Sequence, residues 1–289
     1  MVDAQTQMVG LMGWPVQHSL SPVMHNAAFA ELGLNWCYVP LAVRPGAMKE
    51  ALGGLVALGF RGSNVTLPHK RTVQRSVDSL AEGARRLGAT NTLIVRRQAD
   101  GSTAIEGHNT DVQGFLQALH HGGFQVSEAS RAVVVGAGGG ARAAIFGLHQ
   151  AGLRDIVVLN RTLERAQAVV EDLGAGAHLR ALALSRETLL DCVERADLLV
   201  NATPMGMWPD VDESIWPNGV PMPRQLTVFD LVYHPLQTRL LHQVRQSGAL
   251  GIDGLGMLVA QGALSFEMWT GVAPPVRIMR AACEEALRR

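Results

Sequence analysis

The sequence predicts an α/β protein built from two α/β domains with a cleft between them. Three observations carry this prediction. Short apolar runs alternate with helix-like stretches in both halves of the 289-residue chain. The apolar run at 133–135 ends in a cluster of glycines, and a helix-like stretch and a second apolar run follow it. Hydrophobic residues make up 47% of the chain and charged residues 17%, which favours compact domains over a disordered chain.

Composition excludes several classes of protein. The 25 basic and 25 acidic residues cancel, so the charge excess of a nucleic-acid-binding protein is missing. No apolar run is long enough to cross a membrane, and the N-terminus lacks the regions of a signal peptide. Three widely spaced cysteines fit neither a disulfide framework nor a zinc site, and the ten histidines lack the spacing of a zinc enzyme. We therefore expect a cytoplasmic protein that binds no metal.

The first region alternates strands and helices. Ser21 and Pro22 predict a helix start, with serine as the N-cap and proline in the first turn. Residues 99–101, Ala-Asp-Gly, predict a hairpin turn, and Asn109 or Thr110 is expected to cap the helix that follows the hairpin. The expected elements are strand 8–12, helix 21–32, strand 36–41, helix 45–59, strands 62–65, 90–95 and 102–106, and helix 111–120.

The second region begins at strand 131–135 and ends in two helical patterns. A helix after the last strand can return to the first region and complete its core. We therefore expect a discontinuous first domain, residues 1–110 plus 255–289, with a mainly parallel sheet, and a second domain at residues 111–254. The stretch 207–225, rich in Pro and Trp, predicts a long irregular loop. The other expected elements are helix 143–151, strand 156–159, helix 185–195, strands 197–200 and 227–231, and helices 257–269 and 276–287.

The glycine cluster is a dinucleotide-binding fingerprint. A buried strand followed by Gly136-x-Gly138-x-x-Ala141 leaves backbone N–H groups at a helix start, where the positive end of the helix dipole suits a pyrophosphate. Gly136 permits the tight turn, Gly138 lets the ligand approach the backbone, and Ala141 keeps helix and strand close. Glycine-rich turns are common, but the helix and strand that follow complete the βαβ unit that the fingerprint requires. The second domain is therefore predicted to be of the Rossmann type.

The end of the next strand predicts the identity of the dinucleotide. A site for NAD usually has Asp or Glu there, which accepts a hydrogen bond from the ribose 2′-hydroxyl. This chain instead has Asn160, Arg161 and Thr162, with Arg165 one helical turn further on. Two arginines without a carboxylate suit a 2′-phosphate, so we predict NADP. The alternative is that both arginines are solvated residues at a helix start.

Three polar clusters of the first region follow strands or start helices, where polar groups face a cleft: residues 18–21, 64–70 and 107–111. In the first cluster, Ser19 and Ser21 are suited to donate hydrogen bonds to a carboxylate. The alternative for Ser21 is a role as N-cap alone.

Lys70 and Asp111 are the candidate catalytic pair. Lys70 stands at an expected helix start, beside the positive end of the dipole, and such local misfits gather at functional sites. If Asp111 faces the same cleft, its carboxylate would orient the ammonium and stabilise its charge. The alternatives are a surface lysine, a favourable first-turn aspartate and, at Thr66, a structural threonine. Three histidines beside the clusters are expected to support the loops or the site: His18, His69 and His108.

The clusters, in this order before a dinucleotide fingerprint, resemble the shikimate dehydrogenase family over nearly the whole chain. Each matching stretch is weak alone, but nine of them occur in the family's order. They are residues 19–22, 64–70, 88–92, 107–111, 136–143, 160–162, 201–206, 230–233 and 253–261. Gly140 stands where the family often has alanine, which leaves phosphate binding intact.

The resemblance implies that NADPH reduces the ketone of 3-dehydroshikimate to give shikimate, in aromatic amino-acid (chorismate) biosynthesis. Hydride transfer leaves negative charge on the ketone oxygen, and within the clusters Lys70 alone offers both a positive charge and a proton. The resemblance makes Lys70 the proton-relaying residue, with Asp111 beside it. The implied substrate-binding residues are Ser19, Ser21 and Tyr233 at the carboxylate, and Thr66, Asn91, Asp111 and Gln261 at the ring hydroxyls and the reacting oxygen.

The resemblance also implies a set of cofactor-binding residues. They are Gly136, Ala137, Gly138, Gly139, Gly140 and Ala141 at the pyrophosphate, Asn160, Arg161, Thr162 and Arg165 at the 2′-phosphate, Thr203, Met205, Gly254 and Met257 on the nicotinamide side, and Leu231 as a further contact.

Two alternatives stay open. A quinate/shikimate dehydrogenase would work in catabolism, often with NAD, and would need a pocket for one more hydroxyl. A sensor of the same fold would bind shikimate-like acids without turnover, but it has no need of a proton donor. The two domains are expected to close around their ligands. The only partner indicated is the small-molecule substrate, with no nucleic acid or membrane, and the sequence selects neither a homodimer nor a monomer.

Overall fold

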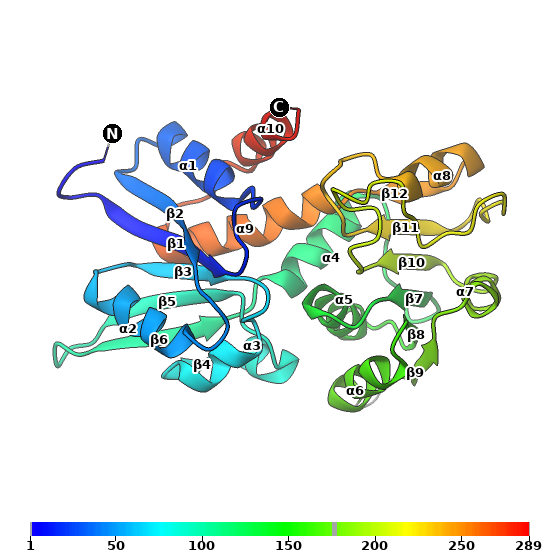
Figure 1. Cartoon of the computed structure of the whole chain (residues 1–289), viewed down its shortest axis with the longest axis horizontal. Helices are drawn as coiled ribbons and strands as arrows, with labels where there is room; N and C mark the ends of the chain where they lie inside the picture. The colour runs from blue at the N-terminus through cyan, green and yellow to red at the C-terminus, as the bar shows by residue number, and fades with distance from the viewer. Residues whose placement is uncertain (1, 175–177, 289) are drawn as a thin grey trace. The chain divides into compact units, whose positions relative to one another are not determined.

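The computed structural model describes residues 2–174 and 178–288. The chain divides into two units, one formed by Met1–Thr110 with Gln261–Arg289 and the other by Asp111–Ala260 (Figure 1). Residues 1, 175–177 and 289, which the predicted domains include, lie outside the described part. Within that part, no helix has the length and apolar character needed to span a membrane.

The first unit contains a six-stranded sheet of mixed direction, in the order β2-β1-β3-β5-β6-β4. β1 runs parallel to β2 and β3, and β4 runs parallel to β6, whereas β5 is antiparallel to β3 and β6. Most pairings are therefore parallel, as predicted. The strands are β1 (Gln7–Gly13), β2 (Trp36–Ala42), β3 (Gly62–Val65), β4 (Ser79–Leu80), β5 (Thr92–Arg97) and β6 (Thr103–His108).

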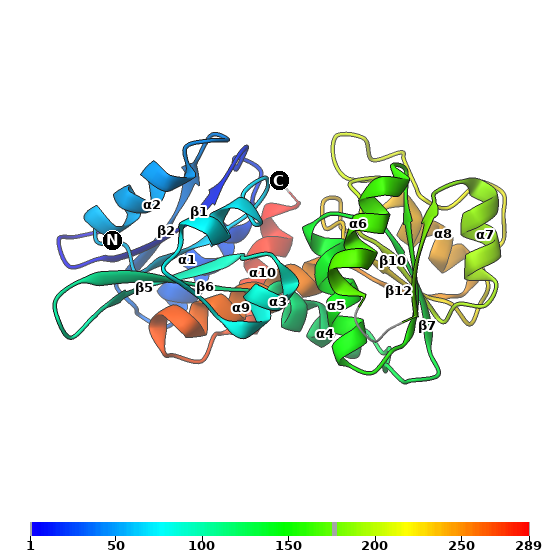
Figure 2. The same cartoon turned by 90° about the horizontal axis from the view of Figure 1, so that it is seen from below.

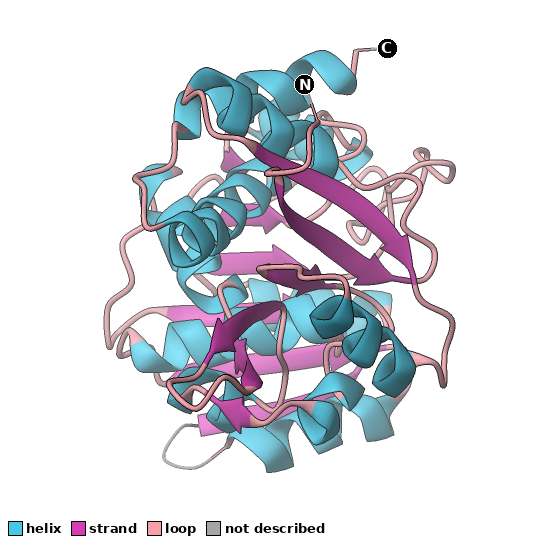
Figure 3. Cartoon of the chain, turned by 90° about the vertical axis from the view of Figure 1, so that its left-hand side faces the viewer, coloured by secondary structure: helices cyan, strands magenta, loops and turns pink. Residues whose placement is uncertain are grey.

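Helices cover both faces of this sheet (Figures 2 and 3). On one face Met12 of β1 packs in an apolar cluster with Leu52 of helix α2. Because side chains alternate along a strand, the neighbouring Leu11 points to the opposite face. On that face Phe29 of α1 stacks on Phe266 of α9 with ring centroids 5.1 Å apart. The helical elements are α1 (Ser21–Glu31), α2 (Met48–Ala57), η1 (Thr72–Ser76), α3 (Glu82–Leu87), α9 (Gly254–Thr270), which begins in the other unit, and α10 (Val276–Ala286).

The second unit contains a six-stranded, fully parallel sheet in the order β12-β11-β10-β7-β8-β9. The chain starts at β7, moves outward to β9 and then returns to the other side of β7. The order reverses between β7 and β10, the position at which doubly wound sheets bind dinucleotides. The strands are β7 (Arg131–Val135), β8 (Asp155–Asn160), β9 (His178–Ala183), β10 (Leu198–Asn201), β11 (Thr227–Asp230) and β12 (Leu250–Ile252).

Helices also cover both faces of the second sheet. Phe115 of α4 stacks on Phe229 of β11 at 5.2 Å, on the face that carries α5 and α6. A separate apolar cluster joins Leu189 of α7, Val244 of α8 and Trp216 of the predicted loop 207–225, so this loop completes the core of the other face. The helices are α4 (Asp111–His121), α5 (Gly139–Gln150), α6 (Leu163–Leu173), α7 (Arg186–Val193) and α8 (Arg239–Ser247).

The structure corrects the prediction that Ser21 caps a helix. Leu20 is the N-cap of α1, and no side chain caps this helix end. Ser21 is instead the first residue of the helix, one position beyond the N-cap.

Two further helix starts differ from the prediction. Helix α2 begins at Met48 and not at residue 45, because Gly46 has a φ of 92°, which an α-helix excludes. Lys70 lies in a turn before η1, a five-residue 3-10 helix, so the expected clash with an α-helix dipole does not arise there. No element was predicted from the sequence at β4, α3, β9, α8 or β12, and α6 was anticipated only as a helix start near Arg161.

Candidate active site

Of the two predicted carboxylate-binding serines, Ser19 lies on the turn between β1 and α1, and Ser21 is the first residue of α1. The Ser19 hydroxyl accepts a hydrogen bond from the backbone N–H of Ser21 at 3.2 Å, which keeps the two residues together. Ser21 is buried. Two hydroxyls held together at this helix start form a suitable donor pair for a carboxylate.

Thr66 and Lys70 follow β3 and are half-buried. The backbone N–H of Thr66 donates to the Met12 carbonyl at 2.8 Å, and a Cβ on Gly13 would lie 2.3 Å from the Thr66 methyl group. A larger residue at Gly13 would therefore displace Thr66. The backbone carbonyl of Lys70 accepts a hydrogen bond from the N–H of Thr90 at 2.7 Å, which fixes the Lys70 backbone close to the start of β5.

Asn91 lies at the centre of a buried group of hydrogen bonds. Its Oδ1 accepts from the Thr110 backbone N–H at 2.8 Å and from the Thr92 hydroxyl at 2.9 Å. Its Nδ2 donates to the Thr110 hydroxyl at 2.9 Å and to Oε1 of Gln261 at 3.2 Å. The structure thus brings the predicted site residues Asn91 and Gln261 together across 170 positions of sequence. Asp111 follows Thr110 directly and is the first residue of α4, in the second unit.

The residues behind Asn91 were given no role from the sequence, although Asn64 lies in the polar cluster at residues 64–70. Oδ1 of Asn64 accepts a hydrogen bond from the Tyr38 hydroxyl at 2.9 Å, and Nδ2 of Asn64 donates to the Asn91 carbonyl at 3.1 Å. The same Nδ2 lies 3.2 Å from the Thr92 hydroxyl and 3.0 Å from the Ser265 hydroxyl. Polar residues at buried strand positions were the available signal, because such groups need partners inside the protein.

In the second unit, the glycine turn after β7 fits a pyrophosphate. Gly136 has a φ of 121°, and a Cβ there would lie 2.7 Å from the Ala202 carbonyl oxygen, so only glycine is accommodated. Gly138 is the N-cap of α5 without a side-chain cap, and a Cβ on it would meet nothing within 4 Å. Backbone N–H groups therefore stand beside open space at a helix start. Ala141 is fully buried against the sheet. The other predicted cradle residues share this turn: Ala137, Gly139 and Gly140.

The end of β8 fits a 2′-phosphate. Nδ2 of Asn160 donates to the Thr162 carbonyl at 2.8 Å and closes a turn. Arg161 and Arg165 are exposed, and within residues 2–174 and 178–288 their side chains form no ion pair or hydrogen bond. Two guanidinium groups at this strand end, with Asn160 in the place of a carboxylate, suit a doubly charged phosphate.

The loop after β10 carries Thr203 and Met205. The Thr203 hydroxyl donates to Oδ1 of Asn201 at 2.7 Å, and the Met205 N–H donates to the Thr203 hydroxyl at 3.2 Å. Nδ2 of Asn201 donates to the buried Asp230 carboxylate at 2.9 Å, and Thr238 donates to the same carboxylate at 2.6 Å. Burial raises the pKa of Asp230 to about 6. Asn201 and Asp230, to which the sequence analysis gave no role, therefore hold the loop in place.

Helix α9 begins directly against the residues that follow β11. A Cβ on Gly254 would lie 2.3 Å from the Leu231 carbonyl oxygen, and the Gly254 N–H donates to the Val232 carbonyl at 3.3 Å. Tyr233 is the next residue along this segment, and Met257 is buried in the first turns of α9. The predicted cofactor residues Leu231, Gly254 and Met257 thus belong to one packed corner of the second unit.

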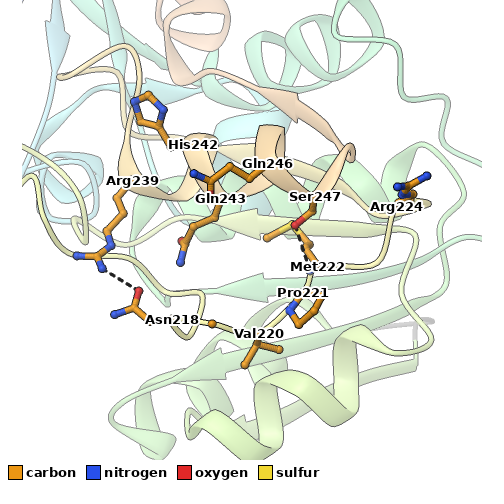
Figure 4. Close-up of a pocket in the computed structure, with 11 residues that line it drawn as sticks. Asn218, Val220, Pro221, Met222, Arg224, Arg239, His242, Gln243, Gln246 and Ser247 are labelled. Carbon is orange, nitrogen blue, oxygen red and sulfur yellow. Dashed lines mark hydrogen bonds between the residues drawn. The ribbon is translucent and has the colours of Figure 1, made fainter.

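A cavity of about 660 Å³ lies elsewhere in the second unit, between residues 218–224 and α8 (Figure 4). Arg239 donates to Oδ1 of Asn218 at 2.8 Å, and the Ser247 hydroxyl accepts from the Met222 N–H at 3.2 Å. These hydrogen bonds connect the loop to helix α8. None of the predicted site residues lines this cavity. In the part of the chain that the structure describes, no three His, Cys, Asp or Glu side chains are placed to hold a metal ion.

A doubly wound parallel sheet with an open glycine turn, joined to a second α/β unit, defines the class: a dinucleotide-dependent oxidoreductase. Three family models match the chain. They describe the substrate binding domain of shikimate dehydrogenase at residues 11–93, shikimate/quinate 5-dehydrogenase at residues 119–207, and the shikimate 5′-dehydrogenase C-terminal domain at residues 254–284. The chain belongs to the shikimate dehydrogenase family.

Individual relatives match over nearly their full length. A shikimate dehydrogenase (NADP(+)) of Methanopyrus kandleri is 46% identical, over 99% of this chain and 98% of its own. The crystal structure of shikimate 5-dehydrogenase from Thermus thermophilus in complex with NADP(H) and shikimate has a TM-score of 0.84 at 39% identity, covering 97% of this chain and 99% of the other. Quinate dehydrogenase from Corynebacterium glutamicum in complex with NAD has a TM-score of 0.86 at 31% identity, with the same coverage of 97% and 99%.

Proposed function

We propose that this chain catalyses the reversible, NADP-dependent reduction of 3-dehydroshikimate to shikimate, a step in aromatic amino-acid biosynthesis. The observation that carries the proposal is the match over nearly the whole chain to an NADP-dependent relative at 46% identity. The exposed Arg161 and Arg165, at a strand end without a carboxylate, support NADP over NAD.

The two units divide the work. We assign the substrate to residues of the first unit: Ser19 and Ser21 anchor its carboxylate, the Asn91–Gln261 pair binds ring hydroxyls, and Thr66 is a further contact. Tyr233, a residue of the second unit, is a further ligand that we assign to the carboxylate. We assign the dinucleotide to the second unit, at the glycine turn and the end of β8. Fixed hydrogen-bonding groups of this kind align the reacting carbon before the chemical step.

Lys70 is positioned to stabilise the negative charge that develops on the substrate oxygen and to protonate it. NADPH held at the glycine turn and the end of β8 would supply a hydride to the ketone carbon, which would leave negative charge on the ketone oxygen. The Lys70 ammonium carries both a positive charge and a transferable proton, so it donates that proton to the oxygen, with Asp111 as its partner. In the reverse direction the Lys70 amine takes the proton back from the shikimate hydroxyl.

The cysteines support a reducing, cytoplasmic setting. Cys37, Cys192 and Cys283 are free thiols. Burial raises the pKa of Cys283 to about 11, so this thiol stays protonated and unreactive at neutral pH.

Initial rates with shikimate or quinate, each with NADP⁺ or NAD⁺, test the assignment. We expect the highest kcat/KM for shikimate with NADP⁺. A higher kcat/KM for quinate with NAD⁺ would overturn the proposal in favour of a catabolic quinate dehydrogenase. Binding of shikimate without turnover under any of the four conditions would instead identify a ligand sensor.

The role of Lys70 is tested by Lys70→Ala. Loss of a general acid–base group typically lowers turnover by about 10²–10⁴-fold, so we expect that decrease in kcat. The dissociation constant for shikimate, measured by calorimetry, should change only a few-fold. Lys49, the other lysine of the chain, is exposed on α2, and Lys49→Ala is the matched control. A near-normal kcat for Lys70→Ala would exclude the proton-relay role.

A further inference from the structure

The cavity between the loop at residues 218–224 and helix α8 has the size of a small-molecule site. Its volume is about 660 Å³, and ligand sites typically measure about 300–1,000 Å³. The cavity belongs wholly to the second unit, and none of the residues assigned to the substrate or the dinucleotide lines it (Figure 4). A ligand there would contact residues that the proposed reaction does not use.

The loop that forms one wall of the cavity is anchored to the core. The buried Trp216 donates a hydrogen bond from its Nε1 to the Val220 carbonyl at 2.9 Å. The Met222 N–H donates to the Ser247 hydroxyl at 3.2 Å, which ties the loop to the end of α8. Gln243 of α8 adds a further connection, because its Nε2 donates to the Trp216 carbonyl at 3.2 Å. The cavity is therefore formed before a ligand binds, as most small-molecule sites are.

The titratable side chains that line the cavity are all basic. They are Arg224, Arg239 and His242, and no Asp or Glu of the described residues joins them, although acidic and basic residues balance in the whole chain. Arg239 donates to Oδ1 of Asn218 at 2.8 Å and to the backbone carbonyl of Asp212, and both acceptors are neutral. Within residues 2–174 and 178–288, the Arg224 side chain forms no ion pair or hydrogen bond. Both guanidinium groups thus carry a positive charge that no carboxylate balances.

The two arginines lie at opposite ends of α8. Arg239 follows the N-cap Thr238 and is the first residue of the helix, where a cation is unfavourable for the helix dipole but an anion is favoured. Arg224 lies beside the other end, since a Cβ on Gly248 would be 3.9 Å from its Nε. At 1.5 Å per residue, Arg239 and Gly248 are about 13 Å apart along the helix. Figure 4 likewise shows the two guanidinium groups at opposite ends of the lining.

The lining between the arginines suits a carbon chain. Val220, Pro221 and Met222 supply apolar surface on the loop side, and Gln243 and Gln246 supply amide groups on the helix side (Figure 4). Apolar walls with a few polar groups at defined points are typical of sites for small organic ligands.

We propose that this cavity binds a small organic dianion, with one acid group at Arg239, the other at Arg224 and a short hydrocarbon chain between them. A guanidinium binds a carboxylate through paired, charge-assisted hydrogen bonds. Arg239 has five N–H donors and uses two of them on Asn218 and Asp212, so three remain for the ligand. The site is separate from the proposed activity and does not depend on it.

Isothermal titration calorimetry with simple dicarboxylates tests the proposal. The enzyme is saturated with NADP⁺, so that the dinucleotide site does not take up the probe. The probes are succinate, adipate and suberate, which increase in length, and hexanoate is the matched monoanion. At constant ionic strength we expect at least one dicarboxylate to bind about tenfold more tightly than hexanoate, the size of one charged hydrogen bond. Equal affinities for hexanoate and all three dicarboxylates would overturn the proposal.

Substitutions then locate the bound probe. Arg224→Gln and Arg239→Gln should each weaken the preferred dicarboxylate about tenfold and remove its advantage over hexanoate, because one acid group loses its partner. Arg277→Gln is the matched control, since Arg277 is exposed on α10 and forms no ion pair or hydrogen bond in the described part of the chain. Binding that neither cavity variant weakens, or that all three variants weaken equally, would refute the site.

The fold and the proposed function are checked independently. The melting temperature of each variant without probe measures folding, and Arg224→Gln alone decides the question if Arg239→Gln loosens the loop. Turnover of shikimate with NADP⁺ should be unchanged in both cavity variants. Absence of turnover in the wild type would refute the proposed function, whereas the calorimetry of the cavity variants would still decide whether the dianion site exists.

Discussion

His25 makes the stability of the first unit depend on pH. Its ring is fully buried among Phe29, Tyr38, Phe266 and Trp269, and neither ring nitrogen has a hydrogen-bond partner in the described part of the chain. Burial lowers the pKa of His25 from 6.5 to about 3, because the charged imidazolium would lose its hydration. The histidine therefore stays neutral in the folded protein at all but very acid pH.

The direction and size of the effect follow from linkage. Because the folded pKa of His25 lies below the unfolded value, the unfolded chain binds more protons between about pH 3 and pH 6.5, and stability falls as the pH falls through that window. A pH of 5 lies 1.5 units below 6.5, the pKa of this histidine in the unfolded chain. At about 1.4 kcal/mol per unit, lowering the pH from 8 to 5 costs about 2 kcal/mol of unfolding free energy.

The perturbation is His25→Phe, which keeps a flat ring and removes the titrating group. We expect the free energy of unfolding of the variant, minus that of the wild type, to rise by about 2 kcal/mol from pH 8 to pH 5 in urea titrations. Poor packing of the larger ring would shift this difference equally at every pH and leave the slope intact. The buried Asp230, whose raised pKa gives the opposite pH trend, is present in both proteins and cancels. A difference that stays constant with pH would refute the reasoning.

Two other predictions concern the second unit. Arg161→Ser combined with Arg165→Ser should raise the KM for NADP⁺ by about tenfold to a hundredfold and leave the KM for NAD⁺ unchanged, because charged hydrogen bonds to the 2′-phosphate are lost; equal changes for both dinucleotides would contradict this. Gly254→Ala should lower stability by about 1–3 kcal/mol, because its methyl group would lie 2.3 Å from the Leu231 carbonyl oxygen. Thermal melts measure this change. Gly53→Ala is the control, because Gly53 lies on an exposed face of α2 and the new methyl group would have open space around it. The control should be neutral or slightly stabilising.

Local patterns in the sequence predicted most of the strands and their turns. Strand 62–65 matches β3, and the Ala-Asp-Gly turn joins β5 and β6 as an antiparallel hairpin with Gly101 at a φ of 86°. These features depend on residues that are neighbours in the chain, so the local sequence is enough to predict them. The two-residue strand β4 escaped prediction because it is too short to show a periodic pattern. Helix α8 was missed although its local signals are present, since Thr238 caps its start and Gly248 follows its end with a positive φ.

Ser21 shows where local reasoning fails. A serine before proline is a favourable start for a helix, and nothing in the local sequence shows that the helix begins one residue earlier. In the structure Leu20 occupies the N-cap position, so Ser21 is the first helical residue and no side chain caps this helix end. The exact residue at which a helix begins is therefore less predictable from local sequence than the helix itself.

The dinucleotide-binding residues and the substrate-binding residues differ in how far the sequence can predict them, because their ligands are bound by different chemical groups. Phosphates are bound largely by backbone N–H groups, and a backbone site requires glycines at fixed spacings within one turn, as at Gly136 and Gly138. The neutral ring of the substrate must be recognised by side chains, and their orientation is set by partners such as Asn91 with Gln261 and Asn64 with Ser265, which lie 170 and 201 positions apart. A buried amide offers both a donor and an acceptor, so its identity alone does not say which end faces the substrate. That choice is made by single backbone groups, the Asn91 carbonyl and the Thr110 N–H, whose positions exist only in the folded chain.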